Sequence, residues 1–332
     1  MTKIIDVHWH HVPQAFADAV ISGKVPVAGQ VVTNDEGKVI VKLDNGFKQP
    51  LPPYLTDPAT ILADMDAAGV DFVAASIAPP LSHLDADPEI ALNVSRAIND
   101  SFAELADGYN GRVLPLGNVP LQDVHLAIAE LRRINDDYGF KGVQLGSNIG
   151  GKNLGDESHF PFWEEVRERD LFVFSHGLSP LGPERMTKHE LKNFVGLPID
   201  TAVSVGSMVF GGVYERLPGL KICYSHGGGA FPCLVGRWDH GYRDRLSKQG
   251  ETTIKMPSDY LVDMYADSLT HDASSLRFLV ERLGAGQVLL GSDHPFDMGE
   301  KDPVGKLKEA IDDPGVVSAI AGDTAARLLG LS

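Results

Sequence analysis

Cysteine is scarce in this chain of 332 residues, which contains only Cys223 and Cys233. Two cysteines are too few for a disulfide framework or for a zinc site built from cysteines alone. The first of them also lies inside an apolar strand pattern. We therefore expect both to be free thiols.

Long apolar runs and basic clusters are missing as well. No run of apolar residues approaches the length of a membrane span, and the N-terminal segment MTKIIDVHWHH enters a strand pattern at once instead of a signal-peptide pattern. The chain has 29 Lys and Arg against 45 Asp and Glu, a formal net charge of −16, and no basic stripe for a phosphate backbone. We expect a cytoplasmic protein that binds neither nucleic acid nor a membrane.

Short β-branched apolar segments alternate with stretches of helical periodicity, a pattern typical of βα units around a parallel sheet. The predicted strands are Lys3–Val7, Phe72–Ile77, Val113–Asn118, Gly142–Leu145, Phe172–Ser175, Lys221–Ser225, Leu261–Ala266 and Val288–Gly291. The predicted helices are Pro58–Ala68, Glu89–Ala106, Val124–Tyr138, Phe160–Arg169, Gly229–Ser247, Ser274–Leu283, Pro303–Ile311 and Ala319–Leu329. This order predicts the α/β class and a (β/α)₈ TIM barrel that spans 1–332 as a single domain, since such barrels reach this length.

Two segments interrupt the alternation. From about Gly23 to Pro53, apolar and polar residues alternate at period two around a glycine-containing turn, which predicts a β-hairpin insertion (about 23–53) after the first strand. Gly177–Leu197, after the fifth strand, is rich in glycine, proline and charge. Because both follow the carboxyl end of a strand, we expect both at the active-site mouth.

The first strand ends in the sequence DVHWH, which contains a His-x-His pair. Residues i and i+2 of a strand point to the same face, so His8 and His10 can meet one metal ion while Trp9 points away. With 12 histidines in the chain, one such pair is weak evidence by itself.

Three more titratable residues follow other predicted strands, namely His176, His226 and Asp293. Strand ends of a barrel converge on one face, so these side chains should join the His-x-His pair. Histidines with a carboxylate suit zinc or a similar first-row ion. Spacing alone does not decide whether His176 or His226 is the third histidine ligand.

The motifs DVHWH, SHG, SHGGGAF and GSDHPF resemble the amidohydrolase superfamily, in particular the branch around aminocarboxymuconate semialdehyde decarboxylase and γ-resorcylate decarboxylase. The resemblance runs nearly from end to end. Its most specific stretches are Lys221–Arg245, Val119–Asp123 and Leu289–Glu300.

The resemblance implies one divalent ion, Zn²⁺ or alternatively Mn²⁺, bound by His8, His10, His176 and Asp293, and no organic cofactor. His226 would stand beside the ion as an acid/base, with Asp293 as a second group able to move a proton. The fourth predicted strand ends in GVQLGSN without a lysine, so no carbamylated bridge is expected and the site should hold a single ion.

The resemblance also implies substrate contacts from Lys48, Arg237 and Phe296. Arg237 would come from the neighbouring subunit, which implies a homodimer or a higher homo-oligomer. Lys48 stands where the relative has an arginine, and lysine cannot grip a carboxylate through two parallel bonds. His294 and Asn148 also depart from the family pattern, so the identity of the substrate does not transfer from the relatives.

These residues predict a metal-dependent, cofactor-free decarboxylase of a small carboxylated aromatic or ring-cleavage product, with a small anionic substrate as its partner. The alternative is a hydrolase in which a metal-bound hydroxide attacks an amide, a lactone or a carbon–carbon bond. A hydratase of an oxo-acid is a third reaction for the same site. A non-enzymatic metal-binding role explains the uncommitted His226 poorly.

Overall fold

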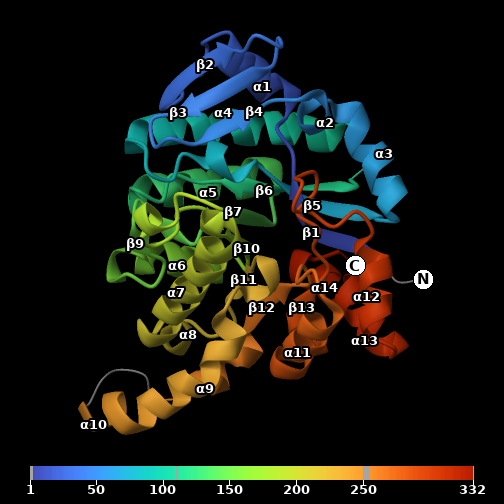
Figure 1. The fold of residues 1–332 in the computed structure, drawn as a ribbon. Coiled ribbons are helices and arrows are strands. Elements are labelled where there is room, and N and C mark those ends of the chain that lie inside the picture. The colour runs from blue at the N-terminus through green and yellow to red at the C-terminus, as the bar shows by residue number, and fades with distance from the viewer. Residues whose placement is uncertain (1–2, 110, 250–254, 332) are drawn as a thin grey trace.

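The computed structural model describes residues 3–109, 111–249 and 255–331. Eight parallel strands form one sheet in chain order, with helices between them (Figure 1). The strands are β1 (Ile5–His10), β5 (Phe72–Ser76), β6 (Val113–Asn118), β7 (Gly142–Gly146), β10 (Phe172–His176), β11 (Lys221–Tyr224), β12 (Met264–Asp267) and β13 (Val288–Leu289). The predicted (β/α)₈ barrel is confirmed.

Backbone hydrogen bonds bring the first and last strands together. Val7 N donates to Leu290 O at 2.9 Å, and Asp293 N donates to His8 O at 2.8 Å. His10 N donates to a carbonyl beyond β13, that of His294, at 2.7 Å. The segment after the short strand β13 therefore closes the ring and brings Asp293 beside the His-x-His pair.

The barrel interior and the helix layer have separate apolar clusters. Phe172 and Phe174 of β10 belong to the smaller cluster, whereas Val173 between them belongs to the larger one. This alternation places the smaller cluster inside the barrel and the larger one between strands and helices. Ala325 and Leu328 of the last helix also join the inner cluster, so this helix closes the barrel at the end opposite the mouth.

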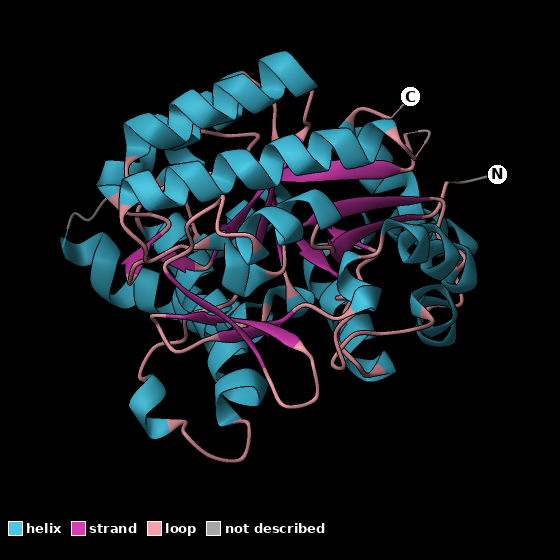
Figure 2. Ribbon diagram, turned by 90° about the horizontal axis from the view of Figure 1, so that it is seen from above, coloured by secondary structure: helices cyan, strands magenta, loops and turns pink. Residues whose placement is uncertain are grey.

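Helices surround the strands (Figure 2). Most predicted helices are present, with shifts of a few residues at their ends. They are α3 (Pro58–Ala68), α4 (Pro88–Asp107), α5 (Val124–Tyr138), α6 (Phe160–Glu168), α9 (Phe231–Gly241), α11 (Ala273–Leu283), α12 (Pro303–Ala310) and α14 (Thr324–Leu329). Aspartates at several N-termini accept backbone N–H bonds that the first helical turn leaves free; these are Asp57, Asp87, Asp123, Asp272 and Asp302.

The main helix missing from the prediction is α7 (Leu197–Phe210), between β10 and β11. With the π-helical turn Lys192–Gly196 before it, it forms the one described helix that is long and apolar enough to cross a membrane by length and composition. Half of that helix is buried, and its Asp200 accepts a 3.0 Å bond from Asn148. It therefore packs as a barrel helix whose polar residues, among them Asp200 and Ser204, are buried, so its pattern differs from that of a helix with an exposed polar face.

Further short helices were not predicted. They are α1 (Gln14–Ile21), α2 (Pro53–Thr56), α8 (Val213–Arg216), α10 (Ser247–Gln249) and α13 (Pro314–Ser318). One strand was also placed too early. The prediction began at Leu261, but the 3₁₀ turns Pro257–Asp263 precede β12, which starts at Met264. The apolar pair at 261–262 belongs to those turns.

The insertion after the first strand has three strands instead of the predicted two. β2 (Gly29–Thr33) pairs with β3 (Val39–Leu43), which pairs with β4 (Lys48–Pro50), all antiparallel. The third strand escaped prediction because its three residues are too few to show a period. A two-stranded ribbon, β8 (Asn148–Ile149) with β9 (Lys152–Asn153), follows β7.

Candidate metal centre

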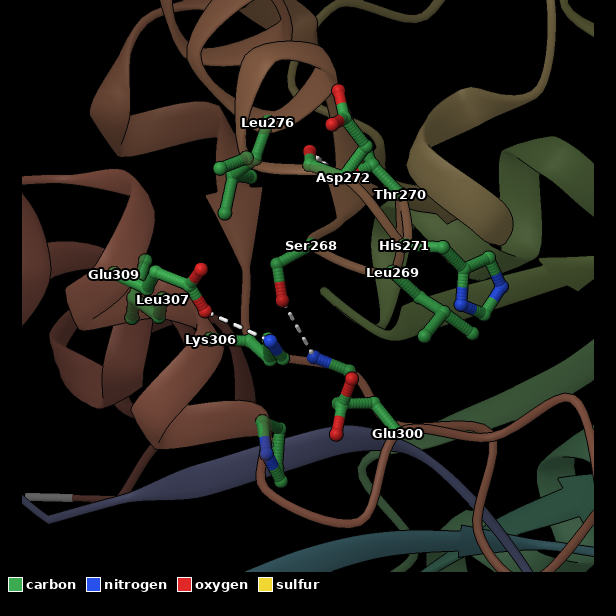
Figure 3. A pocket seen from close by; sticks show the side chains of 13 residues that line it. Ser268, Leu269, Thr270, His271, Asp272, Leu276, Glu300, Lys306, Leu307 and Glu309 are labelled. Atoms are coloured by element: carbon green, nitrogen blue, oxygen red, sulfur yellow. Dashed lines mark hydrogen bonds and ion pairs between the residues drawn. The ribbon is translucent and has the colours of Figure 1, made fainter.

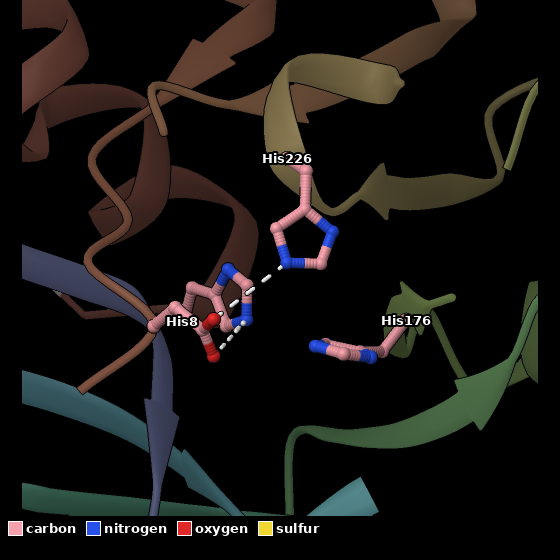
Figure 4. Close-up of side chains that lie close together, drawn as sticks. His8, His176 and His226 are labelled. Atoms are coloured by element: carbon pink, nitrogen blue, oxygen red, sulfur yellow. Dashed lines mark ion pairs between the residues drawn. The ribbon is translucent and has the colours of Figure 1, made fainter. Parts of the chain in front are cut away.

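Four histidines and one aspartate converge at the carboxyl ends of the strands, and Figure 4 shows three of the histidines, His8, His176 and His226. His8 and His10 come from β1, His176 ends β10, and His226 and Asp293 follow β11 and β13. The ring centroid of His8 lies 5.1 Å from those of His10 and His176 and 5.2 Å from that of His226. His176 lies 5.1 Å from His10 and 4.9 Å from His226. Residues from distant parts of the chain thus form one cluster, as predicted.

The Asp293 carboxylate lies at the centre of this cluster. Its Oδ1 is 3.2 Å from both His8 Nε2 and His10 Nε2, and its Oδ2 is 3.7 Å from His226 Nε2. One ligand atom each of His8, His176, His226 and Asp293 lies within 4.8 Å of the others. The structure therefore brings together all five predicted residues. The assignment of His226 as acid/base and His10 as ligand stays a prediction, because distances alone do not separate them.

Several atoms of the cluster are buried without a hydrogen-bond partner among the described residues. They are Nε2 of His8, His10 and His176 and Oδ1 of Asp293. Buried polar atoms are rarely left unpaired, since each costs free energy comparable to a lost hydrogen bond. A divalent cation would satisfy all four at once. Three nitrogens and one oxygen are a donor set that first-row ions accept, so the residues fit a metal ion.

The other ring nitrogen of each of these histidines is held by an acceptor. His8 Nδ1 donates to Asp267 Oδ2 at 2.7 Å, and His176 Nδ1 donates to the carbonyl of the next residue at 2.8 Å. His10 Nδ1 lies 3.1 Å from Ser76 Oγ. With Nδ1 engaged in this way, the Nε2 lone pair is directed at the centre, as metal-binding histidines require.

Asp267, at the end of β12, is a residue of the site that reasoning from sequence did not assign to it. Besides binding His8, it accepts backbone N–H bonds from His226 at 3.0 Å, Gly227 at 2.8 Å and Leu269 at 3.1 Å. It therefore positions both a metal ligand and the loop that carries His226. Burial would raise the pKa of Asp267, but the His8 hydrogen bond and the nearby imidazoles hold it below its usual value.

Two residues of the cluster have left-handed backbone conformations that side chains rarely adopt. The φ of His226 is 56° and that of Asp293 is 59°. Such conformations cost of order 1–3 kcal/mol each and are concentrated at functional sites. In both cases the backbone turns just past a strand end, which aims the side chain at the cluster.

Without a metal ion, protons take the place of the cation. Burial would lower the pKa of His8, but the Asp293 and Asp267 carboxylates raise it to about 10. Burial would raise the pKa of Asp293, but the charge of His8 and the other imidazoles close to its carboxylate hold that pKa well below its usual value. Burial lowers the pKa of His176 strongly, so its ring is neutral. A metal ion would replace the proton on His8 in this ion pair.

A cleft in front of the cluster has two lobes that share His226 and Asp293. The smaller lobe, about 300 Å³, reaches the insertion and the loop after β10, and its lining includes Phe47, Gln49 and Lys192. The larger lobe, about 520 Å³, is lined by side chains of α7, α9 and α11. Such volumes suit small aromatic or ring-cleavage acids.

The three residues predicted to contact substrate have different positions. Phe296 lines the smaller lobe, with its ring centroid 5.3 Å from that of His10. Lys48 is exposed and lines neither lobe, although its neighbours Phe47 and Gln49 do. Arg237 is exposed on α9 and also lines neither lobe. The structure brings Phe296 to the site but not Lys48 or Arg237, and the residues that reasoning from sequence missed are Gln49 and Lys192.

The two other departures from the family pattern do not line the cleft either. His294 stacks on Trp9 with ring centroids 3.9 Å apart, and its Nε2 is 3.1 Å from Asp64 Oδ2. Asn148 donates to Asp200 and, at 2.9 Å, to the carbonyl of Ser179. Both side chains are thus engaged with other residues of the fold and line neither lobe.

A further cleft of about 200 Å³ lies between α11 and α12 (Figure 3). Its charged side chains include Lys306 and Glu309, which pair with each other at 2.8 Å. Ser268 accepts the Gly291 N–H at 3.3 Å across it. This cleft contains neither His226 nor Asp293, so it is separate from the metal centre.

The family model described as Amidohydrolase matches residues 5–331, nearly the whole chain. The chain is a member of the amidohydrolase family. The resemblance of the chain to this family is therefore confirmed.

Curated relatives of this amidohydrolase are decarboxylases. It is 34% identical to 2-amino-3-carboxymuconate-6-semialdehyde decarboxylase of Dictyostelium discoideum over 98% of this chain and 91% of that protein. It is 27% identical to γ-resorcylate decarboxylase of Rhizobium radiobacter, over 72% of this chain and 76% of that protein. These names favour decarboxylation over the hydrolase alternative.

Solved structures share the fold at low identity. A 2,6-dihydroxybenzoate decarboxylase complexed with 2,6-dihydroxybenzoate matches with a TM-score of 0.81 and 23% identity, and both chains are fully covered. A dihydroxybenzoic acid decarboxylase from Polaromonas sp. JS666, with bound manganese, matches with a TM-score of 0.82 and 21% identity over 100% of this chain and 98% of that one. The barrel of this amidohydrolase is thus one that also occurs in metal-containing decarboxylases.

Proposed function

We propose that the protein is a metal-dependent, cofactor-free decarboxylase of a small carboxylated aromatic acid or ring-cleavage product. The observation that carries the proposal is the set of unpartnered Nε2 and carboxylate atoms beside His226, in a chain whose full-length curated relative is a decarboxylase. A bound divalent cation would supply Lewis-acid stabilisation of the negative charge that develops as CO₂ leaves.

Decarboxylation breaks the bond between the substrate carbon and its carboxylate, leaving the electron pair on that carbon until a proton arrives. His226 is suited to deliver this proton, because it lines both lobes and its side chain is 19% exposed. Its Nδ1 lies 3.0 Å from Ser225 Oγ, which fixes the ring with Nε2 toward Asp293. Exposure to solvent allows the ring to be protonated again after each turnover.

Isotopic labelling tests the reaction. In heavy water the metal-loaded protein should release CO₂ from a hydroxybenzoate or a carboxymuconate-type acid and place one deuterium on the carbon that lost it. A hydrolase would instead incorporate oxygen from ¹⁸O-labelled water into a new carboxylate. Failure to release CO₂ from any acid of either type would refute the proposal.

For the ion itself we infer zinc, because histidine nitrogens and carboxylate oxygens are donors that catalytic zinc takes. Manganese is the alternative, since solved decarboxylases with this fold contain it. Elemental analysis of the purified protein, followed by removal and replacement of the ion, distinguishes the two. The zinc assignment requires that zinc restore full activity to the metal-free protein and that manganese not exceed it.

We also infer that the protein is a homodimer or higher homo-oligomer in which Arg237 reaches the partner's cleft. Large apolar side chains are exposed around the larger lobe of the cleft, with Phe194 56% and Phe278 42% exposed. Patches of this kind mark interfaces. Arg237 lies four residues after Cys233, which lines that lobe, so both residues share one face of α9.

Sedimentation velocity measures the oligomeric state, and subunit mixing tests the role of Arg237. Arg237→Ala and His226→Asn subunits should each be inactive alone but regain partial activity when mixed, because a mixed dimer contains one complete site. A monomer in solution, or no recovery on mixing, would contradict the shared site.

A further inference from the structure

The smaller lobe of the cleft has one source of permanent positive charge. Among the described residues, Lys192 is the only lysine or arginine that lines either lobe. It shares the smaller lobe with His176, His226 and Asp293. An anionic substrate that enters this lobe therefore meets Lys192 on the wall next to the metal centre.

The Lys192 ammonium is held by an aromatic ring and not by a carboxylate. Its Nζ lies 4.0 Å from the ring centroid of Phe47, in the connection that leads into β4 of the insertion. Glu190 and Asp297 also line the lobe, yet Lys192 forms no ion pair with any described residue. An aromatic face attracts a cation without accepting conventional hydrogen bonds from it. The N–H donors of the Lys192 ammonium therefore remain available to a ligand.

The surroundings of Lys192 also hold it in place. The side chain is half-buried, and burial lowers its pKa from the ordinary value, so an anion bound beside it would restore its preference for the charged state. Its backbone belongs to a turn in which Asn193 N and Phe194 N both donate to Glu190 O, at 2.9 and 2.8 Å. The ammonium is thus fixed between the loop after β10 and the insertion.

The residue suggested by the family resemblance is placed differently. Lys48 lies on the exposed face of β4, while Phe47 and Gln49 on either side of it line the lobe. Successive residues of a strand point to opposite faces, so Lys48 and the lining residues are separated by the sheet itself. Gln49 offers a neutral amide to the lobe, which leaves the charge to Lys192.

We propose that Lys192, stacked on Phe47, is the substrate-positioning residue that binds a carboxylate of the substrate. This rests on the proposed function and assigns a specificity contact within the same cleft. Lysine binds as a point charge and does not impose the two-point geometry of arginine, so it accepts carboxylates at a range of angles. In a protein with a net charge of −16, such a local cation favours the binding of an anion.

Equilibrium binding tests the assignment without relying on turnover. Metal-loaded wild type, Lys192→Met and Lys192→Arg are titrated by calorimetry with 2,6-dihydroxybenzoate and with benzene-1,3-dicarboxylate. Resorcinol, which lacks the carboxylate, is the matched neutral ligand. Lys188→Met is the matched control protein, because Lys188 is exposed in the same loop and lines neither lobe. Metal content is measured for every variant.

Lys192→Met should bind both carboxylates roughly ten- to a hundredfold more weakly, as expected for a lost hydrogen bond to a charged group, and resorcinol within twofold of wild type. Lys192→Arg should recover part of the affinity, and Lys188→Met should match wild type. With an acid that the enzyme decarboxylates, Lys192→Met should raise KM more than it lowers kcat.

Equal carboxylate affinity in Lys192→Met and wild type would overturn the assignment, as would an equal loss for resorcinol or an absence of carboxylate binding in wild type. The assignment would also be overturned if Lys48→Met bound carboxylates more weakly than wild type while Lys192→Met bound them equally well. That result would favour the contact implied by the family resemblance. Absence of CO₂ release by wild type from any acid would instead refute the proposed function, while the binding difference at Lys192 would still be measurable.

Discussion

His8 Nδ1 donates a 2.7 Å hydrogen bond to Asp267 Oδ2, which joins the first strand of the barrel to the seventh. Both side chains are fully buried. The same carboxylate accepts the backbone N–H groups of His226 and Gly227, so one aspartate fixes both His8, a proposed metal ligand, and the loop of His226, the proposed acid/base. The metal centre thus depends on a residue that does not itself face the ion.

Replacing Asp267 with asparagine should therefore weaken metal binding. The amide keeps the size of the side chain but cannot supply the charge that orients His8 and increases its basicity, so we expect a loss of metal affinity of roughly 10- to 100-fold. Competition with a chelator measures this affinity. Asp312→Asn, at an exposed position, is the control and should bind the ion as wild type does. Equal affinity in Asp267→Asn would contradict the orienting role.

The predicted roles of His10 and His226 are separated by a metal-to-activity comparison. His226→Asn should keep close to one ion per chain while kcat falls by about 10²–10⁴, the range for loss of a general acid/base. His10→Asn should lose metal affinity first, and excess metal should restore part of its activity. Elemental analysis and CO₂ release measure the two quantities. If His226→Asn is the variant that loses its ion, the assignments must be exchanged.

The barrel was predictable because its signals are local. A strand buried on both faces is apolar throughout and a barrel helix is amphipathic, so alternation alone gave the order of the units. β6 agrees with the prediction at both ends. Prediction failed where a local signal was weak, as in α7, whose polar residues Asp200 and Ser204 are buried, and in β4, which has three residues.

The cluster of metal-binding side chains was predictable from strand ends, whereas the wall of the cleft was not. Whether Lys48 or Gln49 faces the cleft depends on the register of a short strand, and a shift of one residue exchanges the two faces. Lys192 lies in a loop, and a loop has no periodic sequence pattern from which its path could be predicted. Asp267 follows a strand as His176 does, but sequence does not tell which strand-end carboxylate faces the ion and which supports a ligand.

The loop that carries His226 should tolerate no side chain at Gly229. Its φ is +61°, and a Cβ there would collide with the carbonyl oxygen of Pro198 at the start of α7. Gly229→Ala should lower the free energy of unfolding by roughly 1–3 kcal/mol, through backbone strain and displacement of the loop. Thermal unfolding and CO₂ release measure the two effects.

Gly236→Ala provides the matched control for Gly229→Ala. Gly236 lies inside α9, and a Cβ there meets no atom within 4 Å. Alanine is a better helix former than glycine, so this substitution should stabilise the protein by about 0.5–1 kcal/mol. Equal stability of the two variants would show that the loop has more room than the structure gives it.

Acid sensitivity should depend in part on Glu165 of α6, which is largely buried against two arginines. Its carboxylate accepts bonds from Arg132 Nε at 2.9 Å and Nη2 at 2.6 Å and also binds Arg169. The hydrogen bonds from Arg132, which outweigh burial, together with those from Arg169 lower the pKa of Glu165 from 4.5 to about 2. The folded state therefore holds this carboxylate ionised at a pH where the unfolded chain protonates it.

The sign of this effect follows from proton binding. Between pH 4.5 and pH 2 the unfolded chain binds a proton at Glu165 that the folded protein does not, so stability is lost as the pH falls through that range. Because Arg132 is 55% exposed, the contribution at neutral pH should be only on the order of 1 kcal/mol.

In denaturant titrations, the stability difference between wild type and Glu165→Gln should be largest above about pH 5 and shrink toward pH 2. Glu164→Gln, at the exposed neighbouring position, is the control, because it experiences the other effects of acid, including protonation of the metal-binding histidines. Its difference in stability from wild type should stay constant with pH. A difference for Glu165→Gln that does not change with pH would mean that this carboxylate contributes through packing and not through its charge.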